Sequence, residues 1–109
     1  MERSITMMMP LDDALPADQI GPRGLIKIDV EGAEALVFQG MQKTLAMRPD
    51  IIVESFDQRS CDSISALVLP LGYRVALIRE DEADVVYQDR LYARNRQQSD
   101  FNQLLTVRP

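Results

Sequence analysis

Short β-rich runs alternate with a helical period in this chain, and that alternation constrains its fold more than any other feature. Leu25 to Val30 is a short run of mostly β-forming residues, and from Glu31 onward apolar residues recur every three or four positions until Pro49. The strand signature then returns at Ile51 to Glu54. Strand, helix and strand in this order predict two adjacent parallel strands joined by a right-handed crossover. We therefore expect an α/β fold, with a helix from about Glu31 to Met47.

The segments on either side of this unit extend the sheet. Ile5 to Met9 predicts one more short strand, and a second helix is expected from about Ser60 until Gly72. The later strands are expected at Tyr73 to Ile78, Asp84 to Gln88 and Leu104 to Val107. Because no helix separates these later strands, they predict an antiparallel edge on an otherwise parallel sheet.

Composition excludes several classes of function. The 109 residues have a net charge of -5, and the 12 Lys and Arg residues are scattered, which argues against a nucleic-acid partner. The chain has no His and a single cysteine, Cys61, so imidazole catalysis, His metal ligands and an internal disulfide are excluded. We expect Cys61 to be a partly buried, inert thiol. No apolar run approaches the roughly 20 residues of a membrane span, so we expect no membrane partner and a cytoplasmic location.

Charged residues in the strand predicted at Leu25 to Val30 indicate a candidate functional site. Alternation puts Lys27 and Asp29 on one face of the strand and its isoleucines on the other. Asp29 lies at the carboxyl end, where open α/β sheets bind ligands, and Glu54 ends the next strand beside it. A structural role fits equally well, with Asp29 as a helix cap, Lys27 as its ion-pair partner and Gly32 in a tight turn. Spacing alone leaves both interpretations open.

The same residues resemble the signature of a known family. The stretches Leu25 to Glu34, Leu36 to Met41 and Pro49 to Glu54 are similar to the core of the FkbM methyltransferases. Flanking features that agree with it are Thr6 to Leu15, Leu71 to Tyr73 and Asp100 to Leu105. The resemblance covers nearly the whole chain. It implies the C-terminal part of a class I, Rossmann-like methyltransferase sheet.

The resemblance also implies a reaction and a set of site residues. Its reaction is in-line transfer of a methyl group from S-adenosylmethionine to a nucleophile, usually a hydroxyl, here of a small molecule or glycan. The candidate catalytic residues are Asp29, Glu54 and Lys27, which orients Asp29. The candidate substrate-binding residues are Glu31, Gly32 and Glu34. No residue is assigned to the cofactor.

One departure from the family pattern affects the expected activity. Such folds hold a nucleotide-type cofactor on a Gly-rich turn after the first strand, but the five glycines of this chain form no such cluster. We therefore expect residues 1–109 to be a single partial domain that lacks the cofactor-binding half. The isolated chain is then expected not to bind the cofactor and to be inactive.

Two other functions remain open. A non-catalytic remnant or assembly module would need a partner for its open strand edges. The edge of Leu25 to Val30 would be open or covered by Ile5 to Met9, and an uncovered apolar edge would favour self-association. A Mg²⁺ site built from the carboxylates is a third and weaker interpretation, because a few acidic residues near a predicted cleft are not specific. We expect no bound metal.

Overall fold

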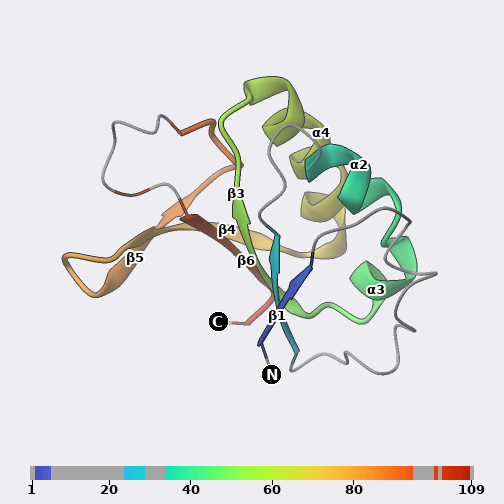
Figure 1. The fold of residues 1–109 in the computed structure, drawn as a ribbon, viewed down its shortest axis with the longest axis horizontal. Helices are drawn as coiled ribbons and strands as arrows, with labels where there is room; N and C mark the ends of the chain where they lie inside the picture. The colour runs from blue at the N-terminus through green and yellow to red at the C-terminus, as the bar shows by residue number, and fades with distance from the viewer. Residues whose placement is uncertain (1, 6–23, 29–33, 95–99, 101, 109) are drawn as a thin grey trace.

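The computed structural model describes residues 24–28, 34–94, 100 and 102–108, together with the backbone of residues 2–5. They form one mixed sheet with helices beside it (Figure 1). Its strands are β1 (Glu2–Ile5), β2 (Leu25–Ile28), β3 (Asp50–Glu54), β4 (Arg74–Arg79), β5 (Asp84–Gln88) and β6 (Asn102–Thr106). Its helices are α2 (Glu34–Gln39), α3 (Gln42–Ala46), α4 (Gln58–Val68) and the short 3-10 helix η2 (Leu69–Leu71).

The strand order is β1-β2-β3-β6-β4-β5. β1, β2 and β3 are parallel neighbours, whereas β6 is antiparallel to both β3 and β4, and β5 is antiparallel to β4. The structure confirms the parallel pairing of β2 with β3 and the antiparallel late edge. It confirms the α/β class as well.

The strand at the N-terminus lies earlier than the sequence pattern suggested. β1 covers the edge of β2 with Glu2–Ile5, so Ile5 is the one residue of the predicted strand Ile5 to Met9 that lies within it. Residues 6–9 lie outside the described part of the chain. The edge of β2 is therefore covered, but by Glu2–Ile5 and not by the predicted Ile5 to Met9, with which β1 shares only Ile5.

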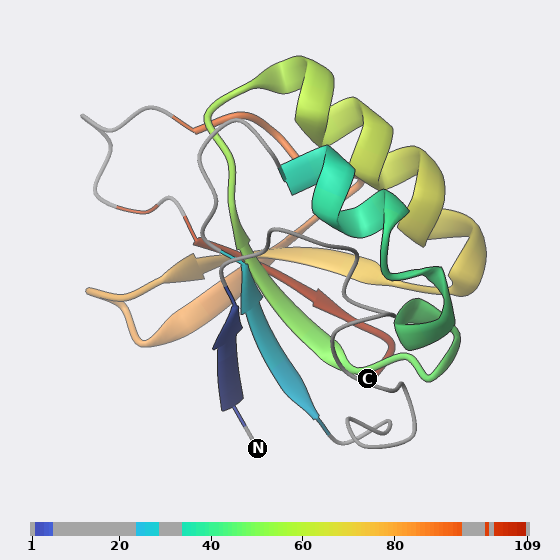
Figure 2. The same cartoon turned by 45° about the vertical axis from the view of Figure 1, so that its right-hand side comes forward.

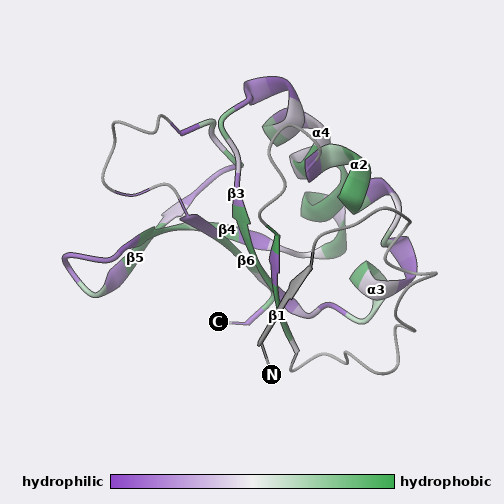
Figure 3. Cartoon of the chain, viewed as in Figure 1, coloured by the Kyte–Doolittle hydropathy of each residue, from purple (hydrophilic) through white to green (hydrophobic). Residues whose placement is uncertain are grey.

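The helices α2, α3 and α4 lie on one side of the sheet (Figure 2). The core forms between that side and the helices, because strand residues alternate and every second one faces the helical layer. The buried apolar residues of this single cluster include Ile26, Ile28, Ile51, Val53, Val75 and Leu105 from the strands and Phe38, Met41, Leu45, Cys61, Ile64 and Val68 from the helical segments. Figure 3 shows the same concentration of apolar residues in α2 and in the central strands.

The prediction of a single helix from about Glu31 to Met47 is wrong, because α2 and α3 are separate helices. The break falls at Gly40 and Met41. The Gly40 N–H still donates to the carbonyls of Leu36 and Val37, at 3.1 Å each, but the backbone of Met41 turns to a φ of -130°. Glycine is a poor helix former, and the turn places the Met41 side chain fully in the core. Residues 31–33 lie outside the described residues.

The second helix begins earlier than Ser60 because of its cap. Both carboxylate oxygens of Asp57 accept hydrogen bonds from the first turn, one from the Arg59 N–H and one from the Ser60 N–H, each at 3.3 Å. An aspartate at this position satisfies amide groups that the helix itself leaves unbonded. α4 therefore starts at Gln58, and η2 carries its end to Gly72 as expected.

A buried tyrosine after η2 is hydrogen-bonded to the residue that precedes β3. The Tyr73 hydroxyl donates to the Pro49 carbonyl at 2.6 Å, and burial is the main cause that raises the pKa of this hydroxyl.

Within the described ranges no helix is both long and apolar enough to cross a membrane.

Candidate active site

The carboxyl ends of β2 and β3 lie side by side, as the sequence predicts. The two parallel strands pair Ile28 with Val53, and these residues directly precede Asp29 and Glu54 in the sequence. Glu54 is the last residue of β3 and is half-buried. Asp29, Glu31 and Gly32 lie outside the described residues, so their predicted roles stay predictions. The structure describes the other three candidates, Lys27, Glu34 and Glu54.

Lys27 and Glu54 belong to the face of the sheet that turns away from the helices. Lys27 alternates with the buried Ile26 and Ile28 and pairs with Ile52, which lies two residues before Glu54 on the same strand. Because side chains two apart in a strand share a face, Lys27 and Glu54 lie on one side. The prediction that Lys27 lies on the opposite face of the strand from Ile26 and Ile28 is confirmed.

Glu34 has a different environment. It is the first residue of α2, within the helical layer, and its exposed fraction is only 2%. Its charge is close enough to raise the pKa of the Cys61 thiol, although burial of that thiol is the largest cause of the rise. Cys61 is fully buried, more so than the sequence suggested, and the raised pKa keeps it a thiol.

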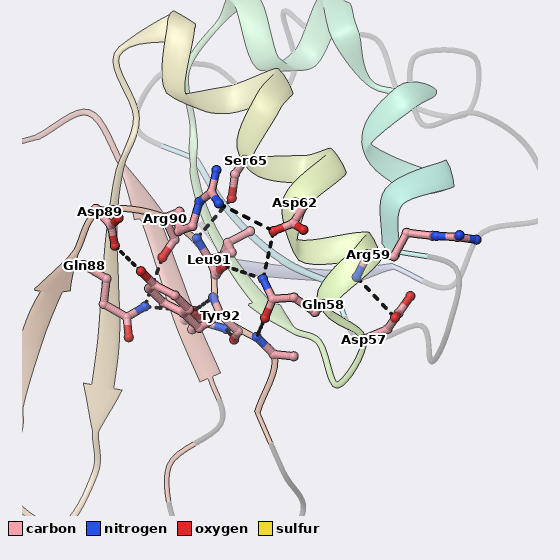
Figure 4. Close-up of polar contacts among 12 residues, drawn as sticks. Asp57, Gln58, Arg59, Asp62, Ser65, Gln88, Asp89, Arg90, Leu91 and Tyr92 are labelled. Atoms are coloured by element: carbon pink, nitrogen blue, oxygen red, sulfur yellow. Dashed lines mark hydrogen bonds and ion pairs between the residues drawn. The ribbon is translucent and has the colours of Figure 1, made fainter.

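The segment from Asp89 to Arg94 is held beside the carboxyl end of β3 by side chains from α4 (Figure 4). The Arg94 N–H donates to the Ser55 carbonyl at 3.0 Å, one residue after Glu54. Gln58 accepts from the Ala93 N–H at 2.9 Å, and the Ser65 hydroxyl accepts from the Leu91 N–H at 3.1 Å. The segment is irregular in its described part, but these hydrogen bonds fix it in place.

Gln103 of β6 holds the same segment from the sheet. Its side chain is fully buried, accepts from the Tyr92 N–H at 3.1 Å and donates to the Tyr92 carbonyl at 2.8 Å. It also accepts from the Gln88 amide at 2.9 Å. The Gln103 side chain thus hydrogen-bonds to both the N–H and the carbonyl of Tyr92, as a neighbouring strand would. Tyr92 is therefore fixed in place although it belongs to no strand.

The comparison with family models decides the identity. Residues 1–75, more than half of the chain, match the model of the methyltransferase FkbM domain. The chain belongs to the FkbM methyltransferase family. The match includes β1, β2, α2, α3, β3 and α4 and ends inside β4. It confirms the family assigned from the motif around Lys27 to Glu34. Neither a search of curated proteins nor a search of solved structures found a match.

Within this FkbM chain, sequence reasoning missed the residues that fix the segment after β5. Gln103 offered one signal, because alternation in Asn102–Thr106 places it on the same face as the buried Leu105. A glutamine at an inward position implies a buried hydrogen-bond partner. Gln58 and Ser65 offered no comparable signal, since polar residues on a helix are ordinary.

The described part of this FkbM protein offers no built metal site. Among the residues with described positions, no group of three or more His, Cys, Asp or Glu side chains is arranged to hold a metal ion. The Mg²⁺ interpretation therefore gains no support from these residues.

Proposed function

We propose that this chain provides the acceptor side of an S-adenosylmethionine-dependent methyltransferase domain, with Asp29 and Glu54 facing the acceptor. The family match supports methyl transfer. The observation that carries the assignment of residues is the parallel register of β2 and β3, which pairs Ile28 with Val53 immediately before the two carboxylates. Ligands of open α/β sheets bind at this edge, outside the carboxyl ends of the strands.

The proposed chemistry is removal of a proton from an acceptor hydroxyl of a small molecule or glycan. When bound, S-adenosylmethionine would supply the methyl group, and a carboxylate of this chain would accept the proton that the acceptor hydroxyl loses. We assign that carboxylate to Asp29 or Glu54, with Lys27 orienting Asp29. Positioned proton acceptors of this kind contribute about 100-fold or more to a rate.

The remaining candidates have supporting roles in this proposal. Glu31 borders the acceptor, and Gly32 has no Cβ that would keep the acceptor from the backbone. Glu34 is buried at the start of α2, so we assign it to holding that helix end in place beneath the acceptor rather than to direct contact.

Residues that would hold the cofactor are not found among those described. The five glycines of the chain form no Gly-rich cluster of the kind that binds a nucleotide-type cofactor. We propose that residues 1–109 do not form that turn.

A complete FkbM methyltransferase with the same motif tests the role of Asp29. Replacing the aspartate that matches Asp29 by Asn should lower turnover by about 100-fold, while the free energy of unfolding changes little. Turnover is measured as transfer of a labelled methyl group, and stability by urea unfolding. The matched control is the Asn substitution at the position of Asp62, an exposed carboxylate on α4. Equal turnover in the two variants, with both folded, would leave Asp29 as a structural helix cap.

A further inference from the structure

Among the residues that the structure describes, no strand covers the outer edge of β5 at one end of the sheet. It is the last strand in the order β1-β2-β3-β6-β4-β5 and lies at the far end of the sheet from β1 (Figure 1). Three consecutive residues of β5 are large and exposed, Val85 at 39%, Val86 at 43% and Tyr87 at 48%. Proteins normally protect such edges with charges, proline or a bulge, because an open apolar edge is a template for another strand.

The side chains of β5 lie on two faces. Val86 pairs with Leu77 on the helical side of the sheet, whereas Val85 and Tyr87 pair with Ile78 and Ala76 on the other side. The charge of Asp84 is already balanced, because the Arg79 guanidinium donates to both of its oxygens at 2.7 and 2.6 Å. The Arg74 guanidinium of β4 lies 3.9 Å from the centre of the Tyr87 ring. Within β5 itself the middle of the strand is apolar, and its one charge, on Asp84, is compensated.

We propose that a second copy of this chain pairs with β5 edge to edge, antiparallel, about a twofold axis at Val86. Val86 then lies opposite Val86 of the second copy, Val85 opposite Tyr87, and Asp84 opposite Gln88. The pairing joins β-branched residues with aromatic ones, a favourable cross-strand combination. The axis is normal to the sheet, so the two helical layers lie on the same side.

The charges beyond the strand ends favour this register. With the axis at Val86, Glu82 in the hairpin turn comes near Arg90 of the second copy, which brings opposite charges together twice by symmetry. A shift of one residue in one direction places Glu82 opposite Asp89 of the second copy, and a shift in the other direction places Asp84 opposite Asp89. Like charges directly opposite destabilise a strand pair. Arg90 is exposed, and its ion pair with Asp62, at 3.9 Å, is long and weak enough to rearrange.

Sedimentation equilibrium of the purified chain tests whether β5 is the interface. The wild-type chain should show a reversible monomer–dimer equilibrium, and Val86→Lys, which places two ammonium groups at the axis, should be monomeric with an unchanged circular dichroism spectrum. The matched control is Leu36→Lys on α2, where Leu36 is 69% exposed, and it should dimerise like the wild type. A monomeric wild type, or a dimer that persists in Val86→Lys, would overturn the proposal.

Charge reversal tests the register. Glu82→Arg and Arg90→Glu should each raise the dissociation constant of the dimer about tenfold or more. The double variant restores opposite charges and should return the constant close to the wild-type value. Single variants without effect, or a double variant at least as weak as the single ones, would contradict the axis at Val86.

Discussion

At the scale of single residues, a buried glutamine holds the segment beside the candidate site in place. Gln103 fixes Tyr92 through both of its backbone groups, and Tyr92 lies two residues before Arg94, which is bonded to the end of β3. The sequence predicted the face of Lys27, because alternation within one strand is a local property. It did not predict the partner of Gln103, because that contact depends on how distant segments come together.

Replacing Gln103 by Leu should destabilise the fold. The change keeps the approximate volume but leaves the Tyr92 amide and carbonyl without their partners, and the loss of such buried hydrogen bonds costs about 3 kcal/mol in total. Urea unfolding measures the free energy. The control is Gln39→Leu on the exposed side of α2, which should change that free energy by less than about 0.5 kcal/mol. A similar small change in both variants would mean that the Gln103 hydrogen bonds contribute little.

At the scale of elements, the sequence predicted which segments are strands and helices better than it predicted where they end. The periods of β2, β3 and the β4–β5 hairpin are strong enough to show in the sequence. The start of α4 depends on hydrogen bonds from Asp57, and the break between α2 and α3 depends on burial of Met41, so neither follows from the period. The residues that end a helix do so through hydrogen bonds and packing contacts, and these contacts form only in the folded chain.

Gly72 is a terminating residue whose effect can be measured. Its φ of +91° lies in the left-handed region, and a Cβ built there would meet no atom within 4 Å. Gly72→Ala should therefore cost about 1 kcal/mol through backbone strain alone. Gly72→Asn should cost less, because asparagine tolerates this region better. Thermal and urea unfolding measure both variants, and an alanine variant as stable as the wild type would show that the turn relaxes without strain.

At the scale of the whole molecule, the antiparallel edge was predictable but the place of β6 was not. β6 enters between β3 and β4, although it comes last among the strands of the described chain. Its inward residues Gln103 and Leu105 are fully buried there, the first bonded to the segment after β5 and the second packed in the core. No local pattern states which strand fills such a gap, because strand order is set by contacts far apart in the chain.

We propose that this FkbM chain carries the acceptor side of a methyltransferase domain and does not form the turn that holds the cofactor. Isothermal titration of the folded 109-residue chain with S-adenosylmethionine tests that claim most directly, with a complete FkbM methyltransferase as the positive control. We predict no saturable heat for the chain and a saturable one for the control. Binding by the chain with a dissociation constant on the order of 1 μM, equivalent to about 8 kcal/mol, would contradict the claim and place the cofactor site within these residues.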